Sequence, residues 1–263
     1  MPLGDFEREV LRVLARNRNP DSFVGGATVL HRASDSPRTS QDIDLFHDAQ
    51  ESVTAAYELD AATLQQAGFI VEQVGLQPGF HRALIRRSDK ATKIEWVYDS
   101  AFRFFPVEAD ADLGWRLNFW DAATNKVLAL VGRQKIRDFL DCYYLHEHHL
   151  HIAALAWAAS AKDPGLTPEL IIDWAARGNR FEPQELAEVR LSKPVDLQEL
   201  KKGWLEALAE SRDLISQLPP AEIGCFYLDS KGKPVKPDPK SAGFQKLTRH
   251  FGSLKGAWPR IVE

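Results

Sequence analysis

The chain of 263 residues lacks the features that mark several large protein classes. Its two cysteines, Cys142 and Cys225, lie in unrelated contexts, so they indicate neither a disulfide framework nor a metal site. No apolar run is long enough to span a bilayer, and the first residues do not combine a basic segment with an apolar stretch. We therefore expect a cytoplasmic protein without a signal peptide and without a membrane partner.

Several well-known catalytic motifs are also missing. The sequence contains no Gly-x-x-x-x-Gly-Lys phosphate loop, no Gly-x-Gly-x-x-Gly fingerprint and no Gly-x-Ser-x-Gly elbow. The histidine-rich segment 146–151 has leucine at position 150, where a His-Glu-x-x-His zinc motif needs histidine. The pattern favours a polar surface over a zinc site there.

The order of apolar patterns predicts an α/β lobe followed by a helical C-terminal lobe. Hydrophobic residues make up 44% of the chain, enough for a substantial core. We expect domains over residues 1–118 and 119–220, with a C-terminal extension over 221–263. Helices are expected over 5–16, 52–67, 122–131, 136–150, 152–161, 167–176 and 197–218, and strands over 23–24, 69–74, 80–87 and 92–98.

The most informative segment joins a glycine turn to a pair of aspartates. Gly25 and Gly26 follow the short apolar strand and open a predicted helix at 27–30, whose free N–H groups can hold a phosphate. Asp42 and Asp44 alternate with apolar residues in the next strand, so both carboxylates project from one face. Because parallel carboxylates repel each other, this pattern favours a magnesium ion bridged to phosphate.

Gly-Gly, a spacer and Asp-Ile-Asp-Leu-Phe resemble the signature of the DNA polymerase β-like nucleotidyltransferase superfamily. Within it, Arg38-x-Ser40-x-Asp42-Ile43-Asp44 is similar to the AbiEii-type abortive-infection toxins. The resemblance covers roughly 23–145 and implies an α/β (α+β) lobe with a mixed sheet. It also implies nucleotide binding by Gly25, Gly26, Thr28, Arg38, Ser40 and Lys126, and two Mg²⁺ ions held by Asp42, Asp44 and Glu95.

Glu95 is the candidate for the third carboxylate that the superfamily needs. It lies in the middle of the second strand of a predicted hairpin and shares a face with Lys93. Asp99, at the end of that strand, is the reserve candidate. The alternative is that Glu95 is an ordinary solvent-facing residue. The basic residues Arg86, Arg87, Lys90 and Lys93 predict a solvated edge, or else a surface that holds triphosphate or RNA.

Segment 125–141 resembles the family's later motifs, in which a lysine on a helix precedes Arg-Asp-x-x-Asp. This resemblance implies catalytic roles for Lys126, which would neutralise triphosphate charge, and for Asp138, which would orient Lys126 or an incoming acceptor. Arg133, Arg137 and Asp141 are weaker candidates. The alternative is a set of surface ion pairs that contribute little.

The C-terminal segment from Cys225 onward differs from the rest of the chain in charge. It carries eight Lys or Arg against three Asp or Glu, a net +5, whereas the whole chain carries −4. Basic residues interspersed with Phe244, Phe251 and Trp258 can bind single-stranded nucleic acid. They can equally belong to a tail whose aromatic rings pack on the helical lobe, which we prefer.

Together, the residues and the resemblance predict a magnesium-dependent nucleotidyltransferase. It would move a nucleoside monophosphate from a nucleoside triphosphate to an acceptor hydroxyl. The toxin resemblance implies a type IV toxin–antitoxin system, with tRNA or another RNA as acceptor and a cognate antitoxin as partner. The alternatives are a non-catalytic nucleotide- or nucleic-acid-binding module, and transfer to a small molecule such as an antibiotic.

Overall fold

We describe the protein from a computed structural model that covers residues 3–32, 36, 38–39 and 42–260. The chain divides into two compact units. The first runs through Ala101 and also includes Pro106–Ala122, and the second comprises Phe102–Phe105 and the chain from Ala123 onward. The segment expected to form a C-terminal extension is part of the second unit.

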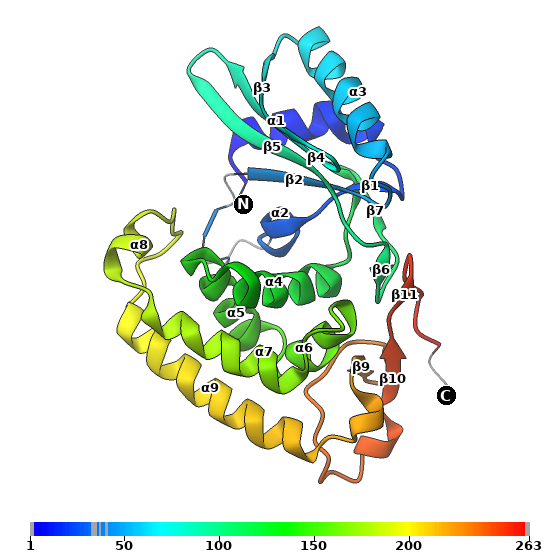
Figure 1. Ribbon diagram of the computed structural model, residues 1–263, viewed down its shortest axis with the longest axis vertical. Helices are drawn as coiled ribbons and strands as arrows, with labels where there is room; N and C mark the ends of the chain where they lie inside the picture. Colours follow the sequence, from blue (N-terminus) through cyan, green and yellow to red (C-terminus); the bar gives the residue numbers. More distant parts are fainter. Residues whose placement is uncertain (1–2, 33–35, 37, 40–41, 261–263) are drawn as a thin grey trace. The chain divides into compact units, whose positions relative to one another are not determined.

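The first unit is built on a mixed sheet, which has seven strands within the described residues, in the order β3-β4-β5-β2-β1-β8-β7 (Figure 1). Strand β2 is parallel to β5, and β1 is parallel to β8, while the other neighbouring strands pair antiparallel. The strands are β1 (Ser22–Val24), β2 (Asp42–His47), β3 (Ile70–Gln77), β4 (Phe80–Arg87), β5 (Lys90–Tyr98), β7 (Glu108–Asp110) and β8 (Gly114–Arg116).

Two helices cover one face of this sheet, α1 (Asp5–Leu14) and α3 (Ser52–Gln66) (Figure 1). Alternation along the strands points apolar side chains at these helices, and they form one buried core. Its members include Val10, Leu14, Ile43, Leu45, Val53, Leu64, Ile94 and Trp96. The short helix α2 (Gly26–Leu30) follows β1 and lies on the other side of β2 (Figure 1). The opposite face carries Asp42, Asp44, Lys93 and Glu95, together with apolar residues such as Phe46 and Val97.

The second unit is mainly helical, as the sequence predicted. Helix α4 (Phe119–Arg133) begins in the first unit and leads into α5 (Ile136–His148), α6 (Ile152–Ala159), α7 (Pro168–Ala175), α8 (Pro183–Ala187) and α9 (Leu197–Gln217). Helix α6 is buried all round, which agrees with its nearly uninterrupted run of alanine, leucine and tryptophan. Short 3₁₀ segments lie at Ala15–Asn17, Ser160–Lys162, Ala176–Arg180, Pro220–Glu222 and Phe244–Lys246.

Two small antiparallel ladders complete the second unit. Strand β9 (Cys225–Leu228) pairs with β10 (Thr248–Phe251), and β11 (Ser253–Leu254) pairs with β6 (Phe102–Arg103). A turn follows β9, since the Asp229 N–H donates to the Lys233 carbonyl over 3.0 Å. The main partner of β9, however, is a strand some twenty residues further along the chain.

No helix in the described ranges is long and apolar enough to cross a membrane.

Candidate active site

Asp42, Asp44 and Glu95 project from the polar face of the sheet. The parallel register pairs Asp42 with Lys93 and Asp44 with Glu95. The residues between them, Ile43 and Ile94, are fully buried on the other face. The predicted alternation of β2 and β5 is therefore confirmed. The three carboxylates lie on two adjacent strands, and neighbouring strands of a sheet are about 5 Å apart.

The opposite face of β5 is anchored by a buried polar cluster. The Trp96 indole N–H donates to Asp60 Oδ2 over 2.7 Å, and the Arg18 guanidinium donates to both oxygens of that carboxylate, at 2.6 and 2.5 Å. Because Trp96 follows Glu95 directly, this cluster fixes the register of the strand beneath the site. Burial, with the nearby charge of Arg18, lowers the pKa of His47 to about 4, so this histidine of β2 is neutral at neutral pH.

The glycine turn brings backbone directly against the acidic strand. The Gly25 N–H donates to the Asp44 carbonyl over 2.9 Å. Gly26 has a φ of +60°, and a Cβ there would lie 1.9 Å from Asp44 Oδ2. At Gly25 a Cβ would meet the Phe46 ring at 2.2 Å. Glycine is required at both positions because the chain passes within contact distance of β2.

Two basic side chains hold the carboxylates in ion pairs. Lys93 Nζ lies 3.1 Å from Asp42 Oδ2 and 3.3 Å from Glu95 Oε1. Arg82 Nε donates to Glu95 Oε1 over 3.0 Å from the neighbouring strand β4. In the described part of the chain, no three acidic, histidine or cysteine side chains converge closely enough to hold a metal as they stand. Lys93 and Arg82 draw the oxygens of Asp42 and Glu95 toward themselves.

The residues nevertheless fit a hard divalent cation. The donor set is three carboxylates on one face, which is the chemistry that Mg²⁺ prefers, and two of them already share one cationic group. Because Gly26 has no side chain, the backbone can approach Asp44 Oδ2, where a Cβ would lie 1.9 Å away.

The other predicted nucleotide-binding residues of this unit have different surroundings. Thr28 is buried, and its Oγ1 has no hydrogen-bond partner within the described residues. Arg38 is also buried, and its guanidinium donates to the Thr39 carbonyl over 3.4 Å. Ser40 lies outside the described residues.

Lys126 and Asp138 come together in the second unit, in a cluster with the buried Asp141 and the exposed Arg133. Lys126 Nζ lies 2.9 Å from Asp138 Oδ1 and 3.1 Å from Asp141 Oδ2. Arg133 donates to both oxygens of Asp138, at 2.7 and 3.0 Å. Lys126, Asp138 and Asp141 are at most 6% exposed, so the alternative of surface ion pairs is wrong for these three residues.

Charge in this cluster is arranged to keep Asp138 ionised. Burial pushes the pKa of Asp138 upward, but the hydrogen bond from Arg133 and the charge of Lys126 outweigh it and lower the pKa. Burial, together with the two aspartates, raises the pKa of the neighbouring Cys142 thiol well above its ordinary value. Cys142 is therefore a neutral packing residue.

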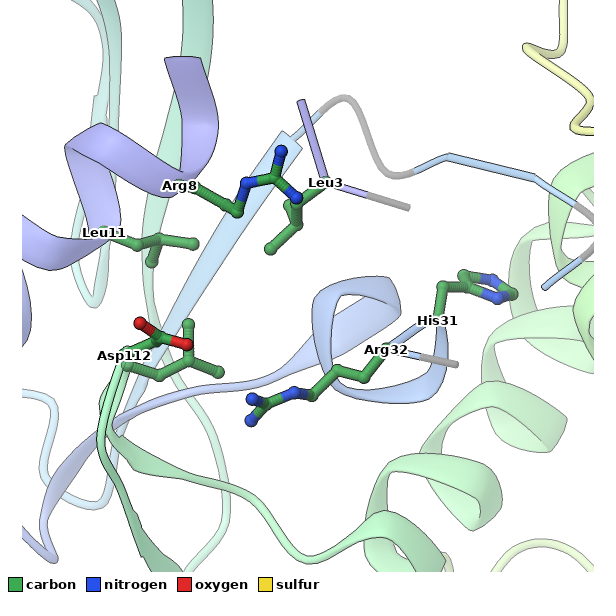
Figure 2. A pocket seen from close by; sticks show the side chains of 7 residues that line it. Leu3, Arg8, Leu11, His31, Arg32 and Asp112 are labelled. Carbon is green, nitrogen blue, oxygen red and sulfur yellow. The ribbon is translucent and has the colours of Figure 1, made fainter. Parts of the chain in front are cut away.

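The first unit also contains a small hollow away from the acidic face, between α1, the end of α2 and the β7–β8 turn (Figure 2). Leu3, Arg8, Leu11, His31, Arg32, Asp112 and Leu113 line it. Its volume of about 40 Å³ is far below the several hundred Å³ of pockets that hold a nucleotide-sized ligand. It is therefore no competitor to the carboxylate face as a nucleotide site.

In the C-terminal segment, the aromatic and basic residues differ in their surroundings. Phe244 is buried against Tyr227, with ring centroids 5.4 Å apart, and Arg249 lies over both rings and pairs with Glu222 at 3.0 Å. Trp258 is 60% exposed. Part of this segment is therefore packed structure.

The fold resembles solved structures across both units. "MenT4, nucleotidyltransferase toxin Rv2826c from Mycobacterium tuberculosis H37Rv" matches with a TM-score of 0.54 and 13% identity, over 82% of this chain and 83% of that one. JHP933 from Helicobacter pylori matches with a TM-score of 0.50 and 17% identity, over 80% and 90% of the two chains. A further H. pylori structure, named for a proposed nucleotidyltransferase, gives 0.52 and 17% over 81% and 94%.

The chain has the nucleotidyltransferase fold. No protein family and no curated protein matches it by sequence. The predicted fold class, a mixed-sheet lobe followed by a helical lobe, is confirmed.

The sequence analysis did not predict the ion pairs that Lys93 and Arg82 form with these carboxylates. Lys93 was expected either at a solvated edge or on a surface that holds triphosphate or RNA, although the alternation that placed Glu95 also placed Lys93 on the same face. Nothing in the sequence around Arg82 indicated this contact, because its position opposite Glu95 depends on the register in which β4 pairs with β5.

Proposed function

We propose that this protein is a nucleotidyltransferase that moves a nucleoside monophosphate from a nucleoside triphosphate to an acceptor hydroxyl, with release of pyrophosphate. The observation that carries the proposal is the register of β2 and β5, which sets Asp44 beside Glu95 on the face that bears Asp42. The Gly25-Gly26 turn supports it, because backbone lies against Asp44 where a phosphate must approach. The neighbours of the same fold support the reaction class.

Asp42, Asp44 and Glu95 would hold two Mg²⁺ ions, whose chemistry is to activate the acceptor hydroxyl and to stabilise charge on the departing pyrophosphate. The chain's own task is then placement. Asp42 and Asp44 would fix the position of the reacting phosphate relative to β2, and the N–H groups at the start of α2 would bind its oxygens.

Lys126 and Asp138 enter the proposal as positioning residues of the second unit. The ammonium of Lys126 is held by two carboxylates, so its position is fixed by the fold and not by substrate. Such a preorganised charge helps most when negative charge shifts during reaction, because no reorganisation is needed at that moment.

We further propose an RNA acceptor, with tRNA as the first candidate, and a toxin activity restrained by a cognate antitoxin. Two observations support this choice. One of the solved neighbours is named a nucleotidyltransferase toxin. The C-terminal segment carries a net +5, which suits a polyanionic acceptor better than a cationic antibiotic.

The test is incubation of the full chain with each labelled nucleoside triphosphate, Mg²⁺ and total cellular RNA. We expect label in RNA, and loss of that label with Asp44→Asn or with a chelator. Asp89→Asn, in the exposed turn between β4 and β5, is the matched control and should keep full transfer.

Binding of nucleotide without any label transfer would contradict the enzymatic proposal and favour a binding module. Label in a small molecule but not in RNA would keep the reaction and reject the RNA acceptor.

A further inference from the structure

Lys93 lies where a metal ion would be expected among the acidic side chains. Its ammonium is 3.1 Å from Asp42 Oδ2 and 3.3 Å from Glu95 Oε1, so one positive group bridges two of the three proposed ligands. Lys93 and Glu95 are alternate residues of β5, and Asp42 is the register partner of Lys93 on β2. The bridge is therefore built into the pairing of the two strands.

Arg82 contacts the same site differently. Its guanidinium reaches Glu95 from β4 at 3.0 Å, on the side of Glu95 away from β2. Arg82 contacts the same Glu95 oxygen, Oε1, as Lys93, but it comes from the β4 side and can keep this contact while a cation binds on the β2 side. Lys93 bridges Asp42 and Glu95, so a cation that bridges the same two carboxylates must compete with it.

We propose that Lys93 is the resident cation of the metal-free site, and that Mg²⁺ binds there by displacing its ammonium from Asp42 and Glu95. This inference rests on the proposed function. It explains why three carboxylates share a face without converging on a common point in the described structure. Without Lys93, Asp42 and Glu95 would repel each other whenever no metal is bound.

The displacement of Lys93 also predicts that the metal binds together with the nucleotide. Mg²⁺ keeps several waters and is usually bound by one or two carboxylates together with substrate phosphates. A metal that arrives with a triphosphate brings negative charge for the released ammonium, and the flexible four-carbon stem of Lys93 allows that ammonium to turn toward it. Metal alone offers the ammonium no new partner. The metal should therefore bind weakly by itself and much more tightly with nucleotide.

The test measures metal binding without turnover. Free Mn²⁺ is followed by its electron paramagnetic resonance signal as full-length protein is titrated, and Mg²⁺ is then added as competitor. Lys93→Met should bind Mn²⁺ about tenfold more tightly than the unchanged protein, because two partly exposed ion pairs no longer compete. Lys93→Arg, which keeps the charge, should remain weak.

Lys90→Met is the matched control, since Lys90 is an exposed lysine and the first residue of the same strand, β5. Its Mn²⁺ affinity should be unchanged. Equal or weaker Mn²⁺ binding by Lys93→Met than by the unchanged protein would overturn the inference.

Asp42→Asn separates this inference from the proposed function. If Asp42→Asn binds Mn²⁺ as well as the unchanged protein, the metal site itself is wrong. If Asp42→Asn loses Mn²⁺ while Lys93→Met gains nothing, the metal site stands and only the displacement of Lys93 fails.

A second measurement needs no variant and therefore decides the matter if Lys93→Met does not fold. Acetylation of lysines by an amine-reactive reagent is followed by mass spectrometry, with and without Mg²⁺. The rate at Lys93 should rise when Mg²⁺ frees its ammonium, while the rate at Lys90 stays constant. No change at Lys93 at saturating Mg²⁺ would refute the displacement.

Discussion

Replacing Gly26 by alanine should cost little stability and most of the transfer activity. The φ of +60° at Gly26 places a side chain in the left-handed region, which costs an L-residue about 1–2 kcal/mol. The new Cβ would also lie 1.9 Å from Asp44 Oδ2 and 2.9 Å from its Cγ. Rotation of the Asp44 side chain moves both atoms away, whereas Asp44 Cβ, 3.2 Å from the new Cβ, remains as a tight contact.

That rotation moves the Asp44 carboxylate out of the position in which it faces Glu95. The stability cost is therefore mainly the backbone strain, whereas the activity falls with the lost ligand. We expect transfer to decrease at least about 100-fold, equivalent to about 2.7 kcal/mol of transition-state stabilisation.

Gly68→Ala is the matched control for Gly26→Ala. Gly68 has a φ of +83°, and a Cβ there would meet no atom within 4 Å. Both variants should lower the unfolding free energy by similar amounts in denaturant titrations, and Gly68→Ala should transfer label normally. Activity of Gly26→Ala within a few-fold of Gly68→Ala would refute the placement of Asp44. A much larger stability loss in Gly26→Ala would show that Asp44 cannot rotate away.

Three further predictions concern other parts of the chain. Glu95→Gln should reduce the transfer rate about 100-fold, whereas Asp99→Asn, beyond the end of β5, should change it little; the reverse result would return the third-carboxylate role to Asp99. Lys126→Met should lower the unfolding free energy by about 3–5 kcal/mol, because it removes the ammonium that pairs with two buried carboxylates; unchanged melting would contradict the cluster. Truncation before Ser241 should lower the melting temperature, because it removes β10 from β9; unchanged melting with a flatter salt dependence of RNA binding would instead assign the segment to RNA.

The cluster around Lys126 also predicts a pH dependence. The pKa of Asp138 is lowered from its usual 3.8, so its ionised form stabilises the folded state above about pH 4. This contribution is lost as the pH falls from the unfolded pKa through the lower folded one, because the unfolded chain takes up the proton first. The unfolding free energy should therefore decrease below about pH 4, and less steeply in Asp138→Asn. An equal slope in both proteins would contradict the assignment.

Much of the fold could be predicted because its signals are local. The hairpin of β4 and β5 followed from two alternating runs around a polar turn, and the order of the long helices followed from apolar spacing and proline breaks. The face shared by Asp42, Asp44 and Glu95 followed from the two-residue period of strands.

What escaped prediction depends on contacts between distant segments. Strands β7 and β8 are three residues each, too short for a periodic signal, and α8 is a five-residue helix. The pairing of β9 with β10 bridges an irregular segment that no local pattern specifies. The burial of Lys126 could not be predicted from its own helix. Charged residues are rarely buried unless they are paired, and the partners of Lys126 lie on the following helix.

For Lys93, the face of the strand could be predicted from the sequence, but the residue that it meets on that face could not. Alternation gives the face of a side chain, but not the neighbour that it meets there, which depends on the strand paired alongside. A lysine on the outer face of a hairpin is normally solvated, and only the parallel pairing of β5 with β2 turns that face into an acidic one. Once Asp42 lies opposite, the same lysine becomes the counter-charge of the carboxylates, and any divalent cation that binds to them must compete with it. The order of the strands therefore determines which charges meet on this face. We expect it to set the affinity for metal, because it places Lys93 beside Asp42.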